Sequence, residues 1–198
     1  MTYHQPFQVI GFHSCDKDLA LQLLRGSNEL RPSNNPWDWL GPGIYFWEQN
    51  PYRALEYAME AASQKQKING SIRTPFIIGA IIELGRCLNL IEPNAINIVK
   101  EAYTSLDKAT KESGESLPQN KGANRALDCA VIKYIHQSNV LKNEPDYDTV
   151  RSPFQEGGEI YANANFSSRL HIEICVRNVS LIKGYFLPQP VKKFNPFL

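Results

Sequence analysis

The segment Gly41–Pro51, with the sequence GPGIYFWEQNP, constrains the fold more than any other part of the chain. A Gly-Pro-Gly turn leads into the run from Ile44 to Trp47, whose aromatic and β-branched side chains are typical of a short strand. Asn50 is a favoured helix N-cap and Pro51 suits the first helical position, so a helix is predicted to begin directly after this strand. The chain must therefore place short strands and helices in close succession.

The rest of the chain carries strand and helix signals at irregular intervals. Apolar stripes at helical spacing predict helices, and runs of apolar or alternating residues predict short strands. We expect helices at 16–26, 51–62, 96–106 and 127–135, and strands at 8–14, 43–47, 75–84, 171–178 and 180–188, the last two joined by a short turn. The segments 31–43, 107–122 and 152–170 are predicted to be loops, with 107–122 the most mobile. This irregular mixture predicts an α+β fold rather than a doubly wound parallel sheet.

The composition fits one ordinary folded domain. The 198 residues suffice for a single well-buried core, so we expect one domain over residues 1–198. With 21 basic and 20 acidic residues the net charge is +1, so no overall field attracts a polyanion, although one local patch is enough to engage nucleic acid. The N-terminus lacks a signal-peptide pattern, and no apolar run approaches the roughly 20 residues of a membrane helix. A cytoplasmic protein without membrane contact is expected.

The four cysteines, Cys15, Cys87, Cys129 and Cys175, are scattered and form no Cys-x-x-Cys pair. This spacing predicts no metal site and reduced thiols. Three of the four lie in apolar sequence, where a free cysteine usually packs as a small core residue.

Three of the predicted strands each carry one chemically reactive side chain opposite their aliphatic residues. Side chains alternate along a strand, so His13, Tyr45 and Glu173 each point away from neighbours that suit the core. We therefore expect the three side chains to share one polar face. A histidine or a tyrosine on a strand also occurs as a structural residue. A carboxylate between Ile172 and Ile174 requires either an exposed sheet face or a cleft.

The segments around these residues resemble the three signature segments of the poly(ADP-ribose) polymerase-like, or diphtheria-toxin-like, ADP-ribosyltransferases. The segments are GFHSCDKDLALQLLRG, GPGIYFWEQNPYRALEYA and EICVRNVSLIKGYF, and together they span residues 11–186. The family carries a His-Tyr-Glu triad on three strands, in the order and local context found here. The resemblance implies a split β-sandwich, with helices packed around two small sheets, and places the chain with the small toxin-type bacterial branch.

The resemblance implies a catalytic role for Glu173, His13 and Tyr45, with NAD+ as co-substrate and no metal. Cleavage of NAD+ releases neutral nicotinamide and leaves an oxocarbenium-like ribose, which the Glu173 carboxylate would stabilise. Tyr45 would stack on the nicotinamide ring, with Tyr57 beside it, and this stacking would hold the cleavable bond in place. His13 would hydrogen-bond the adenosine ribose.

Further cofactor contacts follow from the same resemblance, and the sequence departs from the family pattern at several of them. Gly11 or Ser14 would offer backbone groups to nicotinamide, but Ser14 stands where the family usually has glycine. Trp47 replaces a small residue. The family's second stacking aromatic falls at Glu56 by direct count, so its role passes to the neighbouring Tyr57.

The acceptor is selected in the resembling enzymes by the loop before the catalytic glutamate, here residues 152–170. Aromatic side chains, amides and one arginine in this loop suit stacking on a nucleobase, and they equally suit a protein surface. The side chains concerned are Phe154, Tyr161, Phe166 and Arg169. We expect ADP-ribosylation of nucleic acid, with RNA favoured, or of protein.

A toxin or antiviral defence role is expected because the toxin-type relatives are of similar size. Such an enzyme needs restraint in its own cell, which predicts an inhibitory partner protein. The predicted contacts are the 152–170 loop and a rim formed by Trp37 and Trp39, since tryptophan is enriched in interface hot spots. The alternative is that both tryptophans pack under their own loop.

Three other functions remain open at this stage. The first is a sensor that binds NAD+ or ADP-ribose without turnover. The second is a Cys-His hydrolase using Cys15 or Cys175 with His13 or His171, although no oxyanion motif accompanies them. The third is transfer of a 2′-phosphate from RNA to NAD+, which requires an arginine cluster that the sequence does not display.

Overall fold

The computed structural model describes residues 7–63, 72–122 and 124–198. It contains helices and strands in irregular alternation. In chain order they are β1 (Gln8–Asp16), α1 (Lys17–Leu24), β2 (Ile44–Glu48), α2 (Pro51–Ser63), β3 (Pro75–Glu83), β4 (Cys87–Asn89), α3 (Pro93–Glu112), β5 (Asn120–Lys121), β6 (Asn124–Arg125), α4 (Ala126–Leu141), β7 (Thr149–Glu159), β8 (Ser167–Val176), β9 (Ile182–Phe186) and α5 (Val191–Phe194).

The centre of the molecule is one seven-stranded mixed sheet in the order β4-β7-β8-β2-β1-β3-β9, and β5 and β6 form a separate two-stranded ribbon. The parallel pair is β4–β7, and the other neighbours are antiparallel. The α+β prediction is confirmed. The predicted division into two small sheets is wrong, because two registered pairs between β1 and β2, Gly11 with Glu48 and Phe12 with Trp47, join the two parts.

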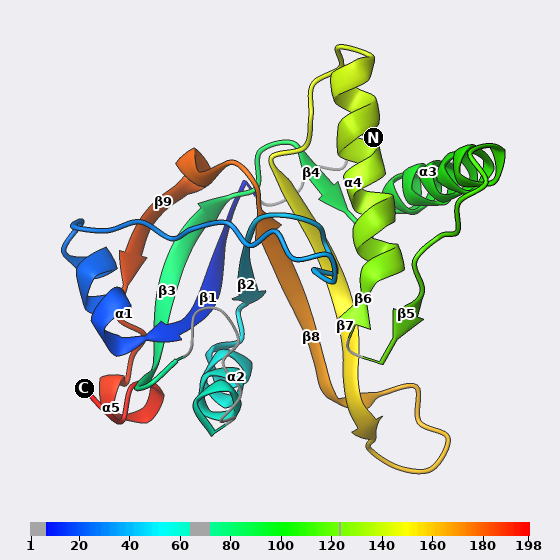
Figure 1. The fold of residues 1–198 in the computed structure, drawn as a ribbon. Helices are drawn as coiled ribbons and strands as arrows, with labels where there is room; N and C mark the ends of the chain where they lie inside the picture. Colours follow the sequence, from blue (N-terminus) through cyan, green and yellow to red (C-terminus); the bar gives the residue numbers. More distant parts are fainter. Residues whose placement is uncertain (1–6, 64–71, 123) are drawn as a thin grey trace.

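The sheet has two wings that meet at this β1–β2 junction (Figure 1). One wing contains β1, β3 and β9 with α1, α2 and α5, and the other contains β2, β8, β7 and β4 with α3 and α4. On one face of the sheet, α2 covers Phe12 and Ile77 in the first wing, while α4 covers Val150 and Cys175 in the second. The opposite face packs against α1 and Leu30. The junction is therefore where a site can form between two separate packing units.

Local signals place the helix starts as predicted. The Asp16 carboxylate accepts a hydrogen bond from the Asp18 backbone N–H at 3.1 Å, and Gly26 ends the turn after α1 with φ of 67°. The Asn50 side chain accepts a hydrogen bond from the Arg53 N–H at 3.0 Å and so caps α2. The stretch between α1 and β2 is irregular, as expected.

The two predicted C-terminal strands both form and are joined by a short segment, whereas the predicted loop at 107–122 is wrong in its first part. The helix at 96–106 continues through Glu112, into the segment predicted to be a mobile loop, where Lys111 and Asp107 form an i,i+4 ion pair at 2.6 Å. The strands β8 and β9 are not neighbours, because β9 pairs with β3 at the far edge of the sheet.

The segment predicted as the loop 152–170 is an extended hairpin. Strand β7 pairs with β8 from Thr149–Val176 to Glu159–Ser167, with a register shift between Glu156 and Glu159. Gly157 has φ of 78° at that shift. Proline and glycine are both unfavourable inside a paired strand. In β7, however, Pro153 lies past the residues that pair with the short β4, and Gly157 lies in the bulge at the register shift. We refer to this element as the β7–β8 hairpin.

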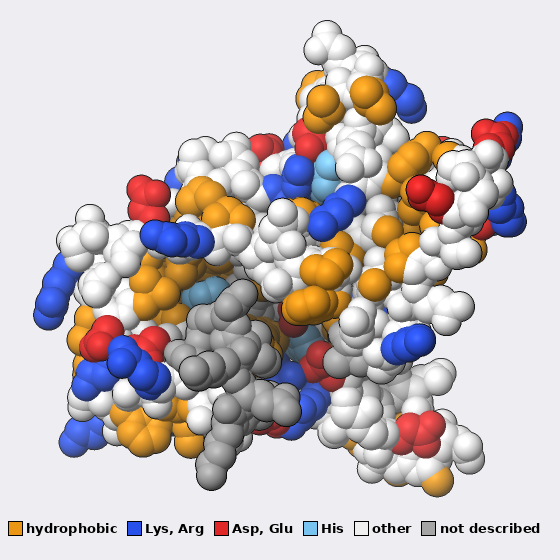
Figure 2. Space-filling model, in the orientation of Figure 1, with side chains coloured by type: hydrophobic (Ala, Val, Ile, Leu, Met, Phe, Trp, Pro, Cys, Tyr) orange, Lys and Arg blue, Asp and Glu red, His pale blue; other side chains and the backbone are white. Residues whose placement is uncertain are grey.

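Charges of both signs are interspersed on the face shown in Figure 2, as expected from the net charge of +1. In the same view the surface is hollowed between the part that carries α2 and the β7–β8 hairpin. Among the residues that the structure describes, no helix is long and apolar enough to cross a membrane.

The Asp146 side chain links α4 to the sheet in the second wing. The Asp146 carboxylate accepts hydrogen bonds from His136 Nδ1 and Arg177 Nη1, both at 2.7 Å, and from the Tyr147 N–H at 2.8 Å. Burial alone would raise the pKa of Asp146, but these donors outweigh it and hold the pKa at about 2. The folded state therefore favours the carboxylate over its protonated form.

Because the Asp146 pKa is depressed on folding, its contribution to stability is present above the unfolded value of 3.8 and is lost as the pH falls toward 2. We expect Asp146→Asn to lower the free energy of unfolding by about 2 kcal/mol at pH 6. Urea unfolding of both proteins from pH 6 to pH 2.5 measures this. A difference that stays constant over that range would contradict the assignment.

Candidate functional site

The Gly-Pro-Gly turn before β2 is held by the side chain of the strand that it introduces. Tyr45 donates its hydroxyl proton to the Gly41 carbonyl at 2.7 Å and accepts the Leu40 N–H at 3.0 Å. Gly41 has φ of 76°, a left-handed conformation that glycine adopts without strain. At Gly43 an added Cβ would collide with the Cys175 sulfur and would lie 2.8 Å from the Val176 carbonyl oxygen. The turn thus closes tightly on β8 and fixes Tyr45.

The Tyr45 hydroxyl is therefore expected to act on stability more than on chemistry. Tyr45→Phe keeps the ring and leaves the Leu40 N–H and one bond of the Gly41 carbonyl unsatisfied. We expect the free energy of unfolding to fall by about 1–2 kcal/mol. Chemical denaturation measures this. Because the ring is retained, the ligand affinity of the folded variant is expected to stay within about threefold of wild type, which corresponds to about 0.6 kcal/mol.

The strand register separates the three predicted site residues. Trp47 pairs with Glu173 on one side and with Phe12 on the other, so these three side chains share a face, and Tyr45 lies on it two residues along. His13 follows Phe12 and lies on the opposite face, where its ring centroid is 5.5 Å from that of Phe46. The prediction that His13, Tyr45 and Glu173 share one face is wrong for His13. Alternation defines the two faces of each strand, but the register between neighbouring strands decides which of these faces coincide.

His13 nevertheless contacts the backbone of the Tyr45 strand. The registered β1–β2 pairs end at Phe12 and Trp47, and beyond them His13 Nδ1 lies 2.8 Å from the Tyr45 carbonyl oxygen. A carbonyl oxygen only accepts, so Nδ1 carries the proton. Burial lowers the pKa of His13, with the bond to Tyr45 acting in the opposite direction. In the neutral ring Nε2 is then an acceptor, suited to a ligand hydroxyl.

Glu173 lies at the centre of the other face, with 17% of its side chain exposed. Its strand partners are Trp47 on β2 and Ser152 on β7. Its Oε1 is 3.2 Å from Nε2 of His171, whose side chain is fully buried. Within residues 7–63, 72–122 and 124–198, Oε2 has no hydrogen-bond partner. One carboxylate oxygen is thus held in place by His171, and the other has no partner in the described part of the chain.

The Tyr57 ring lies beside the face that carries Glu173, whereas Glu56, the residue at the family position by direct count, is engaged elsewhere. The Tyr57 ring centroid is 5.1 Å from that of Trp47, which neighbours Glu173 on the sheet. Burial and the Glu173 charge raise the pKa of Tyr57, so the phenol remains protonated at neutral pH. Glu56 instead forms ion pairs with Arg53 and Arg169. The structure therefore brings Tyr45, Trp47, Tyr57 and Glu173 to one face.

A set of ion pairs that the sequence did not predict links α2 to the β7–β8 hairpin. Arg53 at the start of α2 pairs with Glu156 at 2.5 Å, and Arg169 pairs with Glu56 at 2.7 Å and with Glu60. The Arg53 side chain is only 8% exposed. The pairing of residues more than a hundred positions apart has no local sequence signal. These bonds hold the hairpin beside the Tyr57–Glu173 face.

The two remaining predicted cofactor contacts, Gly11 and Ser14, have structural partners. An added Cβ at Gly11 would lie 2.7 Å from Phe46 Cβ and 2.8 Å from Ile82 Cδ1, so close packing requires glycine there. The Ser14 hydroxyl donates to the Ala54 carbonyl at 2.5 Å and ties β1 to α2. Backbone contact between either residue and nicotinamide stays a prediction.

The cysteine environments disfavour thiol chemistry. Burial, with a contribution from Asp16, raises the pKa of Cys15 to about 12, and burial also raises the pKa of Cys175. A thiol nucleophile needs a depressed pKa, so neither suits the Cys-His hydrolase alternative.

The two tryptophans of the predicted rim have different environments. Trp37 is 44% exposed, whereas Trp39 packs edge-on against Phe154 with ring centroids 4.4 Å apart. The hairpin tip is more exposed, with Ile160, Tyr161 and Phe166 each more than half exposed. The exposed apolar side chains are therefore concentrated at the hairpin tip rather than at both tryptophans.

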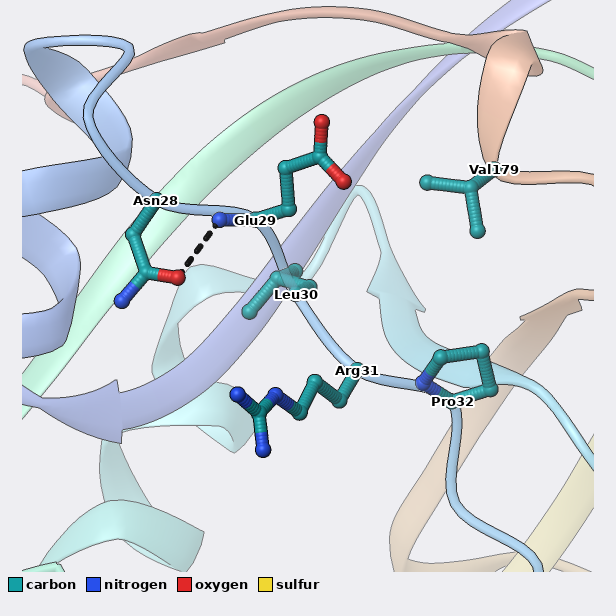
Figure 3. Close-up of a pocket in the computed structure, with 6 residues that line it drawn as sticks. All are labelled: Asn28, Glu29, Leu30, Arg31, Pro32 and Val179. Atoms are coloured by element: carbon teal, nitrogen blue, oxygen red, sulfur yellow. Dashed lines mark hydrogen bonds between the residues drawn. The ribbon is translucent and has the colours of Figure 1, made fainter.

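An open pocket lies on the other face of the sheet, formed by the chain after α1 (Figure 3). Its lining residues are Asn28, Glu29, Leu30, Arg31, Pro32 and Val179. Leu30 packs in the same cluster as Val9 and Cys15, which flank His13 on its face of β1. The pocket therefore lies on the His13 side of the sheet and away from Glu173.

Comparison with known proteins gives one distant similarity. The chain is 25% identical over 202 residues to the uncharacterized protein MJ0359 of Methanocaldococcus jannaschii, covering 92% of this chain and 90% of that protein. No family model matches the chain, and no solved structure matches it.

Proposed function

We propose that this protein is an NAD+-dependent ADP-ribosyltransferase. The observation that carries the proposal is the Glu173 carboxylate, with one oxygen hydrogen-bonded to His171, beside the neighbouring Trp47 and Tyr57 rings. A carboxylate stabilises a ribose cation, and flat aromatic rings bind nicotinamide. In the reaction the bond from ribose C1′ to nicotinamide breaks, the electron pair leaves with nicotinamide, and an acceptor nucleophile bonds to C1′ and loses its proton.

The position of His13 sets a condition on how NAD+ binds. Its Nε2 acceptor suits the adenosine ribose hydroxyls, but it faces the opposite side of the sheet from Glu173. A dinucleotide that contacts both residues has to cross the sheet where β1 and β2 diverge. We expect His13→Ala to weaken NAD+ binding without lowering turnover at saturation. His13 would contact the adenosine end of NAD+, and the bond that breaks lies at the nicotinamide end.

The acceptor is proposed to dock along the β7–β8 hairpin. Exposed Tyr161 and Phe166 offer stacking surfaces, while Glu156 and Glu159 keep the hairpin from being basic. Aromatic side chains stack on unpaired bases of single-stranded RNA, so RNA is our first choice and protein our second.

The test combines nicotinamide release with label transfer. Purified protein is incubated with NAD+ labelled in the adenylate, in separate reactions with RNA, single-stranded DNA and protein extract. We expect nicotinamide release and label on one acceptor class. Binding of NAD+ without nicotinamide release would instead support the sensor, and the absence of both would reject the proposal.

A toxin or defence role predicts an effect on growth. We expect wild-type expression to slow growth and Glu173→Ala to restore it, because the substitution removes the carboxylate proposed to act on NAD+. Growth curves at matched protein levels, measured by immunoblot, test this. Equal growth of the two strains would reject the toxin role and leave the transferase proposal intact.

A further inference from the structure

The His171 ring has both nitrogens engaged, and the partners define where its protons are. Nδ1 lies 2.8 Å from the Arg169 carbonyl oxygen, which only accepts, so Nδ1 carries a proton. Nε2 lies 3.2 Å from Glu173 Oε1. A neutral ring with its proton on Nδ1 would turn a lone pair toward the carboxylate oxygen, which is unfavourable. Both contacts are satisfied together when the ring is an imidazolium.

From this geometry we propose that His171 is a positioning residue, whose imidazolium fixes the orientation of the Glu173 carboxylate for its role at the ribose. The inference deepens the transferase proposal and rests on it for the reaction served. His171 touches no substrate atom in this scheme. It holds Oε1 and thereby directs Oε2 outward.

The surroundings of His171 favour its charged form. Burial opposes the charge, but the hydrogen bonds to Glu173 and to the Arg169 carbonyl outweigh it, so the pKa of His171 is raised. Glu156 on β7 adds a second negative charge, and the Phe154 ring, 6.0 Å away between centroids, forms an apolar wall. The nearby charges of α2 are engaged elsewhere, with Arg53 bound to Glu156 and with Glu56 and Glu60 bound to Arg169.

The raised pKa gives a direction for the pH dependence. The hydrogen bond from protonated His171 to Glu173 Oε1 is present below the pKa of folded His171 and is lost as the pH rises through it. Turnover should therefore decline on the alkaline side. A group that merely fills space would give no such decline.

Two variants separate these roles. His171→Phe keeps a buried ring without donors and is expected to lower kcat about 10- to 100-fold, the scale of misplacing a reacting group by about 1 Å. His171→Gln restores a neutral N–H donor to Glu173, so it should recover most of kcat and abolish the alkaline decline. An unchanged kcat in His171→Phe, or an alkaline decline that persists in His171→Gln, would overturn the positioning role.

A second readout does not depend on the reaction. Ring-proton NMR titration, with His171 assigned by its loss in His171→Gln, should give a pKa above the unperturbed value of about 6.5. In Glu173→Gln that pKa should fall. The same titration in both proteins would overturn the ion pair. A confirmed pair in a wild-type protein that releases no nicotinamide would reject the transferase proposal and keep the pair.

Discussion

Glu173→Gln is expected to reduce NAD+ turnover by about 10²–10³, the scale of losing one electrostatic stabiliser of a transition state. The amide keeps the shape of the side chain and its place beside Trp47, so NAD+ affinity should change little. The loss should therefore appear in kcat and leave KM nearly constant. Steady-state measurement of nicotinamide release gives both constants.

A matched control is Glu159→Gln on the same hairpin. Glu159 is exposed and accepts a hydrogen bond from the Asn163 N–H at 3.0 Å, away from the aromatic face. Its NAD+ hydrolysis in the absence of acceptor should equal that of wild type. Turnover of Glu173→Gln within twofold of wild type, or an equal loss in both variants, would contradict the assignment of Glu173.

Gly43→Ala is expected to have the largest effect on stability, lowering the free energy of unfolding by about 3 kcal/mol, because overpacking of a tight contact forces the backbone to move. The added methyl group would meet the Cys175 sulfur and the Val176 carbonyl, which belong to the strand that carries Glu173. Displacement of β8 should also lower activity. Urea unfolding and nicotinamide release measure the two effects.

Gly158→Ala controls for the substitution itself. Nothing lies within 4 Å of a Cβ built at Gly158, and its φ is not in the left-handed region. Its stability should remain within about 0.5 kcal/mol of wild type. Equal destabilisation by the two substitutions would mean that the contact at Gly43 is not what holds the turn.

Signals confined to neighbouring residues predicted much of the fold. The caps at Asp16 and Asn50 depend only on the residues that follow them, and both helices begin where they indicate. His171 and Glu173 are two residues apart on β8, and alternation along one strand is sufficient to put both side chains on one face. Such features need no knowledge of which strands become neighbours.

Features that depend on pairing between distant segments were predicted less well. The face taken by His13 is set by the pairing of Phe12 with Trp47, which alternation within one strand cannot reveal. Strand β7 carries Pro153 and Gly157, which locally indicate a loop, and it is a strand because β8 pairs along it. The link between Arg53 and Glu156 arises only when that hairpin reaches α2.

The most direct test of the central claim is a crystal structure of the protein with a non-hydrolysable NAD+ analogue. We predict that the nicotinamide ring packs against the Trp47–Tyr57 face and that the adjacent ribose 2′-hydroxyl lies within hydrogen-bond distance of Glu173 Oε2. An analogue bound in the pocket of Asn28 and Arg31, with its nicotinamide ribose away from Glu173, would contradict it.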